Sequence, residues 1–178
     1  MLIQNSFKII ELLPQELWQL SEVKNYLRIS DDYDDNLITN LIDTAISSAE
    51  NFIGLSLVNR RIEFRAKLQK QQQFVLKYQP IRTITEIFTE KDENKTVLNN
   101  EQYYFDTTHS SLHLLQPINT TTLVVHYISG FSSNNTPSTI KYGILLHVAE
   151  MYDREAALEN SFSSAVRNLY LPYRQLKI

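Results

Sequence analysis

The sequence predicts an α+β fold in which N-terminal helices and a long C-terminal helix pack together, with an antiparallel β lobe inserted between them. Apolar residues recur at helical spacing in residues 34–53 and again in residues 140–152. Between these stretches, residues 62–68 alternate apolar and charged side chains with the period of a strand. This order of helices, strands and helix is typical of an α+β protein.

Length and composition favour one domain. The chain has 178 residues, of which 43% are hydrophobic and 21% are charged, and a chain of this size can bury a core of its own. We expect a single domain over residues 1–178. Its helical part is expected to comprise residues 1–56 and 136–178, and its β lobe residues 57–130.

Two helices are predicted near the N-terminus. Ser21 can cap a short helix that runs to about Arg28. A second helix begins near Asp34 and ends at Gly54, a residue suited to the left-handed conformation that closes a helix. Its apolar stripe is Leu37, Ile38, Leu41, Ile42, Ala45, Ala49, Phe52 and Ile53.

The middle block predicts short antiparallel strands separated by polar turns, one of which is residues 91–95. In residues 62–68 one face is apolar and the other is charged, which indicates a strand with one solvated face. The expected strands are 62–68, 74–78, 83–89, 103–105, 112–115 and 123–128.

The last third predicts one long helix. Thr136 can cap it, Pro137 can be its first residue, and it is expected to carry residues 152–155. Gly143 lies inside this helix, where glycine costs about 1 kcal/mol relative to alanine. We therefore expect another element to approach Gly143 closely.

Charge and cysteine content exclude several functions. The net charge is −3, and residues 1–56 carry three basic and nine acidic side chains. No basic cluster exceeds the pair Arg60 and Arg61, so sequence-specific nucleic-acid binding is not expected. The absence of cysteine removes disulfides and thiolate metal sites. Residues 1–13 resemble neither a signal peptide nor a membrane span, which predicts a protein made in the cytoplasm without membrane contact.

Four carboxylates, Asp31, Asp32, Asp34 and Asp35, form what we call the acidic turn. Residues 32–43 partly match a calcium-binding loop, but Leu37 stands at the sixth position, where glycine is needed for the sharp turn. We therefore expect these carboxylates to favour a helix N-terminus rather than hold a metal.

Catalytic motifs are missing from the sequence. His147 precedes Glu150 by three residues, so an alternative hypothesis is a small metal-assisted hydrolase that uses the acidic turn with His147 and Glu150. However, the chain has no two-histidine zinc motif, no Gly-x-Ser-x-Gly turn and only three glycines. We expect no catalytic residue, no metal and no cofactor, and hence a protein that is not an enzyme.

The aromatic residues 103–105 could stack on the bases of a single-stranded nucleic acid. We instead expect them to lie in the core of the protein or in a contact between subunits.

Several short motifs occur in a recognisable order. They are residues 20–29 (LSEVKNYLRI), the acidic turn, residues 37–54, residues 76–81 (LKYQPI), 103–106, 125–131 (VHYISGF), Pro137, 152–155 (YDRE) and 171–174 (LPYR). In this order they resemble the head-tail connector, or head-completion adaptor, proteins of tailed phages, including prophage and gene transfer agent relatives. The resemblance spans nearly the whole chain.

The resemblance implies a structural adaptor of the virion neck. Such a protein forms a homo-oligomeric ring on the portal, extends the DNA channel without binding a DNA sequence, and joins the head to tail or head-closure proteins. It would lie in the host cytoplasm before assembly.

The candidate portal-binding residues lie in an apolar and basic stretch near the C-terminus. They are Leu169, Tyr170, Leu171, Pro172, Tyr173 and Arg174. Such a stretch rarely stays exposed without a partner, although it could instead fold back over the protein's own core.

Overall fold

The computed structural model describes residues 5–14, 17–68, 72–92, 94–116, 118, 122–132, 134–153 and 163–175. The chain divides into two compact units. The β unit comprises Met1–Pro14 and Asn59–Gly130, and the helical unit comprises Gln15–Val58 and Phe131–Ile178. Each unit contains its own cluster of buried apolar side chains.

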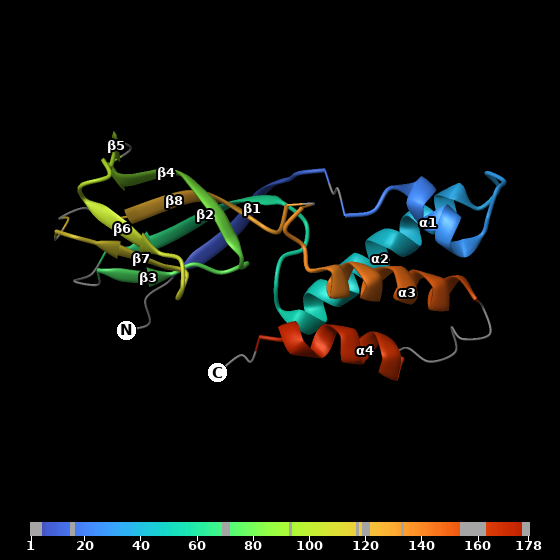
Figure 1. Cartoon of the computed structure of the whole chain (residues 1–178). Helices are drawn as coiled ribbons and strands as arrows, with labels where there is room; N and C mark the ends of the chain where they lie inside the picture. The colour runs from blue at the N-terminus through green and yellow to red at the C-terminus, as the bar shows by residue number, and fades with distance from the viewer. Residues whose placement is uncertain are drawn as a thin grey trace. The chain divides into compact units, whose positions relative to one another are not determined.

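The β unit contains two antiparallel sheets (Figure 1). The five-stranded sheet has the order β1-β2-β8-β4-β5, and the three-stranded sheet has the order β3-β7-β6. The strands are β1 (Ser6–Leu12), β2 (Arg60–Lys67), β3 (Gln73–Val75), β4 (Ile81–Lys91), β5 (Asn94–Val97), β6 (Tyr103–Asp106), β7 (Ser111–Leu114) and β8 (Thr122–Ser129).

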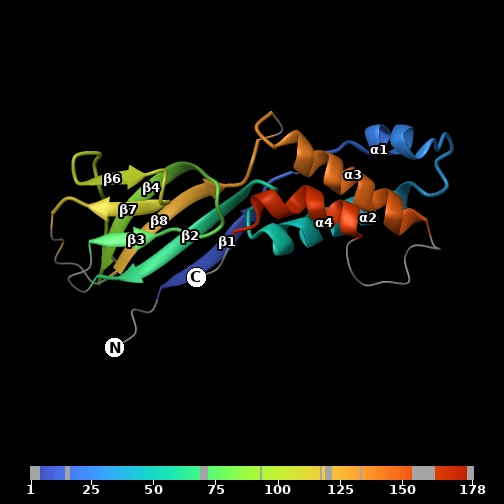
Figure 2. The same ribbon diagram turned by 60° about the horizontal axis from the view of Figure 1, so that its bottom comes forward.

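Side-chain alternation decides which face of the five-stranded sheet is buried. In β2, Ile62 and Phe64 are fully buried, and they lie opposite Tyr127 and Val125 of β8 in the antiparallel register. These residues belong to one apolar cluster with the inner residues of the three-stranded sheet, which lies over this face in Figure 2. The intervening residues of β2 therefore face the other side of the sheet.

The helical unit contains α1 (Leu20–Leu27), α2 (Asp35–Ile53), α3 (Ser138–Tyr152), α4 (Ser164–Tyr170) and the short 3₁₀ helix η2 (Leu171–Tyr173). Gln19 and Glu22 form a capping box at the start of α1, so the cap lies two residues before the Ser21 cap expected from the sequence. The predicted end of α2 is confirmed, because Gly54 adopts a left-handed φ of 79°.

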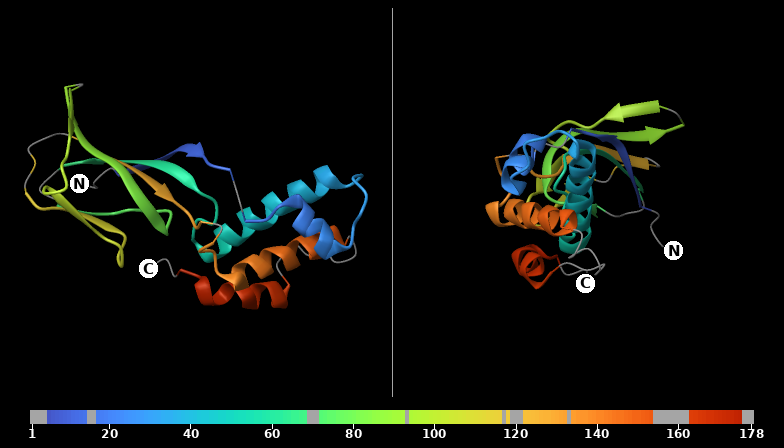
Figure 3. Two further views of the ribbon diagram at one scale, coloured as in Figure 1. Left: turned by 45° about the horizontal axis from the view of Figure 1, so that its top comes forward. Right: turned by 90° about the vertical axis from the view of Figure 1, so that its right-hand side faces the viewer.

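Three helices of this unit pack side by side, with α3 in contact with both α2 and α4 (Figure 3). Ala45 of α2 and Ile144 and Val148 of α3 are buried in the same apolar cluster, and Leu41 packs at its border. Glu50 of α2 also fixes the chain that follows this helix. Its carboxylate accepts hydrogen bonds from the backbone N–H groups of Leu57 and Val58 at 2.7 and 3.1 Å.

The predicted fold class is wrong. The described residues form eight strands in two antiparallel sheets and four α-helices of 7 to 19 residues, so the protein is β-rich and lacks the long C-terminal helix. The chain leaves α3 at Asp153, whose backbone is extended (φ −75°, ψ 100°), and α4 starts anew at Ser163, whose hydroxyl caps it. Of the expected helical residues 152–155, Arg154 and Glu155 lie outside the described residues.

Two strands, β1 and β5, were not predicted. In β1 six of the seven residues are exposed, and the seventh, Phe7, is half-buried. The sequence of β1 therefore lacks the alternation of apolar and polar residues that identifies a half-buried strand. The polar residues of β5 were interpreted as part of a turn, yet they pair with the second half of β4.

The expected close approach at Gly143 is confirmed, and the approaching group is the ring of Tyr170. A Cβ atom at position 143 would lie 2.5 Å from a carbon of this ring, and Tyr170 is fully buried. Glycine at position 143 therefore makes room for the aromatic ring that attaches α4 to α3.

We predict that Gly143→Ala destabilises the protein by about 1–3 kcal/mol, because overpacking outweighs the roughly 1 kcal/mol gain in helix propensity. In a Tyr170→Ala background the same change should be neutral or stabilising. Urea denaturation of the four proteins of this double-mutant cycle measures the coupling. Equal effects of Gly143→Ala in both backgrounds would contradict the packing explanation.

Candidate functional site

The structure divides the six predicted portal-binding residues between core and surface. Leu169 and Tyr170 end α4, and Leu171, Pro172 and Tyr173 form η2, which Arg174 caps. Tyr170 is buried, Leu169 and Tyr173 are half-buried, and Leu171, Pro172 and Arg174 are exposed. We call residues 169–175 the C-terminal segment. Its buried residue anchors it, and its exposed residues form an outward-facing surface.

The C-terminal segment is attached to the end of α2. The backbone N–H of Gln175 donates a hydrogen bond of 2.7 Å to the carbonyl oxygen of Ile53. The guanidinium group of Arg174 lies 4.9 Å from the centre of the Phe52 ring, a cation–π contact. These contacts hold the exposed side chain of Leu171, which has 52% of its surface accessible, in a defined position.

The carboxylates of the acidic turn have protein partners. Lys24 bridges Asp32 and Asp35 at 2.7 and 2.6 Å, and this bonding lowers the pKa of Asp32. The hydroxyl of Tyr152 donates to Asp34 at 2.6 Å, which links the end of α3 to the start of α2. The acidic turn therefore stabilises the junction of three helices.

His147 and Glu150 lie on α3, and burial lowers the pKa of His147. The carboxylate of Glu150 accepts a hydrogen bond from the hydroxyl of Ser163, the residue that caps α4. Among the described residues, no group of three or more His, Cys, Asp or Glu side chains could hold a metal ion. Glu150 thus helps to fix the residue that caps α4. It does not form a metal-binding group with His147 and the acidic turn among the described residues.

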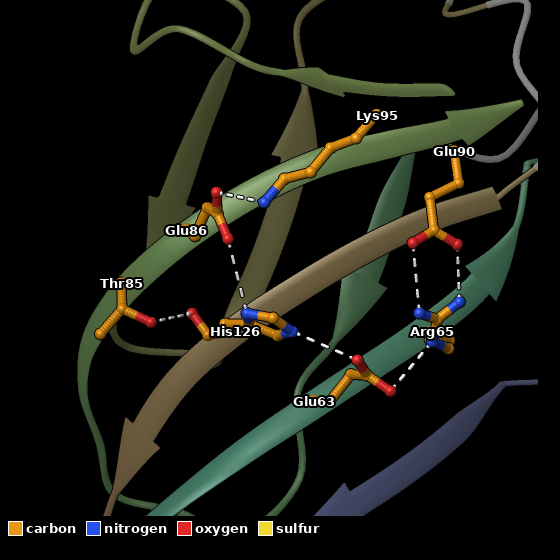
Figure 4. A network of polar contacts seen from close by, with 7 residues as sticks. All are labelled: Glu63, Arg65, Thr85, Glu86, Glu90, Lys95 and His126. Carbon is orange, nitrogen blue, oxygen red and sulfur yellow. Dashed lines mark hydrogen bonds and ion pairs between the residues drawn. The ribbon is translucent and has the colours of Figure 1, made fainter. Parts of the chain in front are cut away.

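A charged network that sequence reasoning did not single out covers the outer face of the five-stranded sheet (Figure 4). Arg65 of β2 forms a two-pronged ion pair with Glu90 of β4, at 2.7 and 3.3 Å, and also contacts Glu63 at 2.9 Å. The hydrogen bonds that Arg65 donates to Glu90 and Glu63 raise the pKa of its guanidinium group. The sequence pattern that could have indicated this network is the row of charged residues that alternates with apolar residues in β2.

His126 of β8 continues this network. Its ring nitrogens lie 3.2 Å from Glu63 and 3.6 Å from Glu86, and Glu86 also pairs with Lys95 of β5 at 2.6 Å. Burial alone would raise the pKa of Glu63, but hydrogen bonds from Arg65 and His126 hold it below its ordinary value. The charged side chains thus connect four adjacent strands.

The network also shields apolar groups on this face. Phe88 is 4% exposed and Val124 is fully buried, and they are cross-strand neighbours. The His126 ring meets Phe88 edge-on at 5.4 Å, and the Lys95 ammonium lies 4.1 Å from the centre of the Phe88 ring. Acidic and basic groups alternate here, so this face lacks the continuous basic track that binds a nucleic-acid backbone.

We predict that Glu63→Gln lowers the free energy of unfolding by about 1.5 kcal/mol at pH 7, the low end of the range for hydrogen bonds to charged groups, because the partners of Glu63 are partly exposed to solvent. Because folding lowers the pKa of Glu63, its ionised form stabilises the protein above the unfolded-state pKa, and this stabilisation disappears as the pH falls through the folded-state value. The difference between mutant and wild type should therefore shrink at pH 3. Denaturant titrations at both pH values test this, with the exposed Glu101→Gln as a control that should change nothing. A loss that stays the same at both pH values would contradict this role for the carboxylate.

One family model matches most of the chain. The family model described as "Head completion protein" matches residues 16–175. No curated protein matches the chain.

Three solved structures share the fold. The chain is 15% identical to a protein in the neck of an empty gene transfer agent (GTA) particle computed with C6 symmetry, with a TM-score of 0.77 over 97% of both chains. A chain in the virion of a native GTA particle is 14% identical, with a TM-score of 0.75 over 97% of this chain and 96% of that one. A chain in the neck of a native GTA particle computed with C12 symmetry is 15% identical, with a TM-score of 0.69 over 97% of both.

The match of the family model extends over most of the chain and includes most of both units, although β1 lies before its first residue. It also includes the acidic turn and all six predicted portal-binding residues, Leu169 to Arg174. The chain belongs to the head completion protein family.

Proposed function

We propose that this protein is a structural adaptor of the virion neck, which joins head to tail by forming a ring on the portal. The observation that carries the proposal is the family match over residues 16–175. The shared fold with chains of GTA necks, which were computed with C6 and C12 symmetry, supports a ring in which one surface of each copy contacts a different surface of the next. The adaptor carries out no reaction, and its partners are the portal and tail or head-closure proteins.

We assign portal binding to the exposed side of the C-terminal segment. Leu171, Pro172 and Arg174 offer an apolar surface with one positive charge, and an exposed apolar group of this kind suits a protein partner. Tyr170 acts through the fold, because its buried ring holds α4 against Gly143. Deleting the whole segment would remove this core residue, so substitutions at exposed positions separate binding from folding.

Packaged DNA passes through the ring without sequence-specific contacts. A net charge of −3 and an acidic N-terminal third disfavour adhesion to phosphates.

Among the helices that the structure describes, none is long and apolar enough to cross a membrane. Before assembly the adaptor resides in the host cytoplasm.

We predict that Leu171→Asp weakens binding to the purified portal ring of the same particle at least tenfold, about 1.4 kcal/mol, because it places a carboxylate in an apolar contact. Biolayer interferometry with immobilised portal measures the affinity, and thermal melting confirms the fold. Tyr33→Asp is the matched control, since Tyr33 is also an exposed apolar residue (93% accessible) and should bind like wild type. If Leu171→Asp retains wild-type affinity, the C-terminal segment is not the portal-binding surface.

A further inference from the structure

The five-stranded sheet ends in two strands that each have one edge open to a further strand. Within the described part of the chain, β1 pairs only with β2, and β5 pairs only with β4. Outward-facing backbone groups on such edges can accept a strand from another chain. The sheet therefore presents two different edges, one at each end.

Both end strands expose apolar side chains. On β1, Ile10 is 46% and Leu12 is 66% accessible, and on β5, Val97 is 58% accessible. Phe7 of β1 also borders an open groove of ≈ 1140 Å³, whose other lining residues include Val75 of β3.

The directions of the strands determine how two copies could join. Every neighbouring pair from β1 through β2, β8 and β4 to β5 is antiparallel, so the chain runs in the same direction in β1 and β5. In a ring of many copies, each neighbour is turned by only a small angle. The β5 strand of one copy would therefore meet β1 of the next as a parallel pair, with the charged faces of both sheets on the same side.

Charge complementarity indicates the register of this pair. Glu11 lies opposite Arg61, and Lys95 lies opposite Glu90, which places both on the charged face. The Glu11 side chain is half exposed, so it can receive an additional cation. In one register of the parallel pair, Lys95 of one copy lies beside Glu11 of the next and away from Lys8, the basic residue of β1. The same register places Thr96 beside Leu12.

We propose that neighbouring copies in the ring join edge to edge, with β5 of one copy added in parallel to β1 of the next, so that the five-stranded sheets form a continuous band. The inference rests on the proposed ring and names the surfaces that build it. A head-to-tail joint of this kind uses two different surfaces and closes only at the correct rotation.

Cysteine cross-linking tests the joint cleanly, because the chain has no cysteine of its own. The double variant Leu12→Cys, Thr96→Cys carries one thiol at each end of the sheet and retains the proposed pair of Glu11 and Lys95. It is assembled on the purified portal ring and treated with a short bis-maleimide. The control variant Leu12→Cys, Tyr33→Cys carries its second thiol on an exposed residue of the helical unit.

We expect a ladder of covalent multimers up to the full ring for the first variant and not for the control, with rings of both variants seen by negative-stain electron microscopy. Rings without the ladder, or cross-links to the portal alone, would overturn the edge-to-edge joint and leave the adaptor function standing. If the wild-type chain forms no ring on the portal, the proposed ring fails and this inference fails with it.

Discussion

The packing of the Tyr170 ring against Gly143 is the contact that places α4 and the C-terminal segment on the helical unit. The ring occupies the space that any Cβ at position 143 would need, and it is fully buried. This contact joins α4 to α3, and the hydrogen bond from Gln175 to Ile53 then attaches the C-terminal segment to α2. Exposed Leu171 therefore lies between residues that the helical unit's own contacts hold in place.

In the β unit, both faces of the five-stranded sheet carry apolar side chains that must be shielded from water. Its five-stranded sheet buries one face against the three-stranded sheet, while the opposite face keeps Phe88 and Val124 away from water under the side chains of Arg65, His126 and Lys95. Ion pairs that are partly exposed contribute little one at a time, but these form a network across four strands. The network stabilises the sheet, while the outer backbone edges of β1 and β5 have no partner strand among the described residues.

Local patterns in the sequence predicted most individual elements but not the fold class. The stripe of α2 and the alternation of β2 were clear because each element buries one face only. By contrast, β1 is exposed on most of its residues, and the end of α3 depends on Asp153, where no proline or glycine marks the break. At the candidate site, the sequence indicated the C-terminal segment, yet it could not separate the buried Tyr170 from the exposed Leu171. That division depends on Gly143, 27 positions earlier, and distant contacts of this kind leave no local pattern.

We propose that this head completion protein forms a ring and contacts the portal through its C-terminal segment. Cryo-electron microscopy of the chain assembled on the portal ring can show both features at once. We expect a closed ring of single copies, with density of the portal against Leu171 and Arg174. A bound dimer related by a two-fold axis, or a ring whose C-terminal segments point away from the portal, would contradict it.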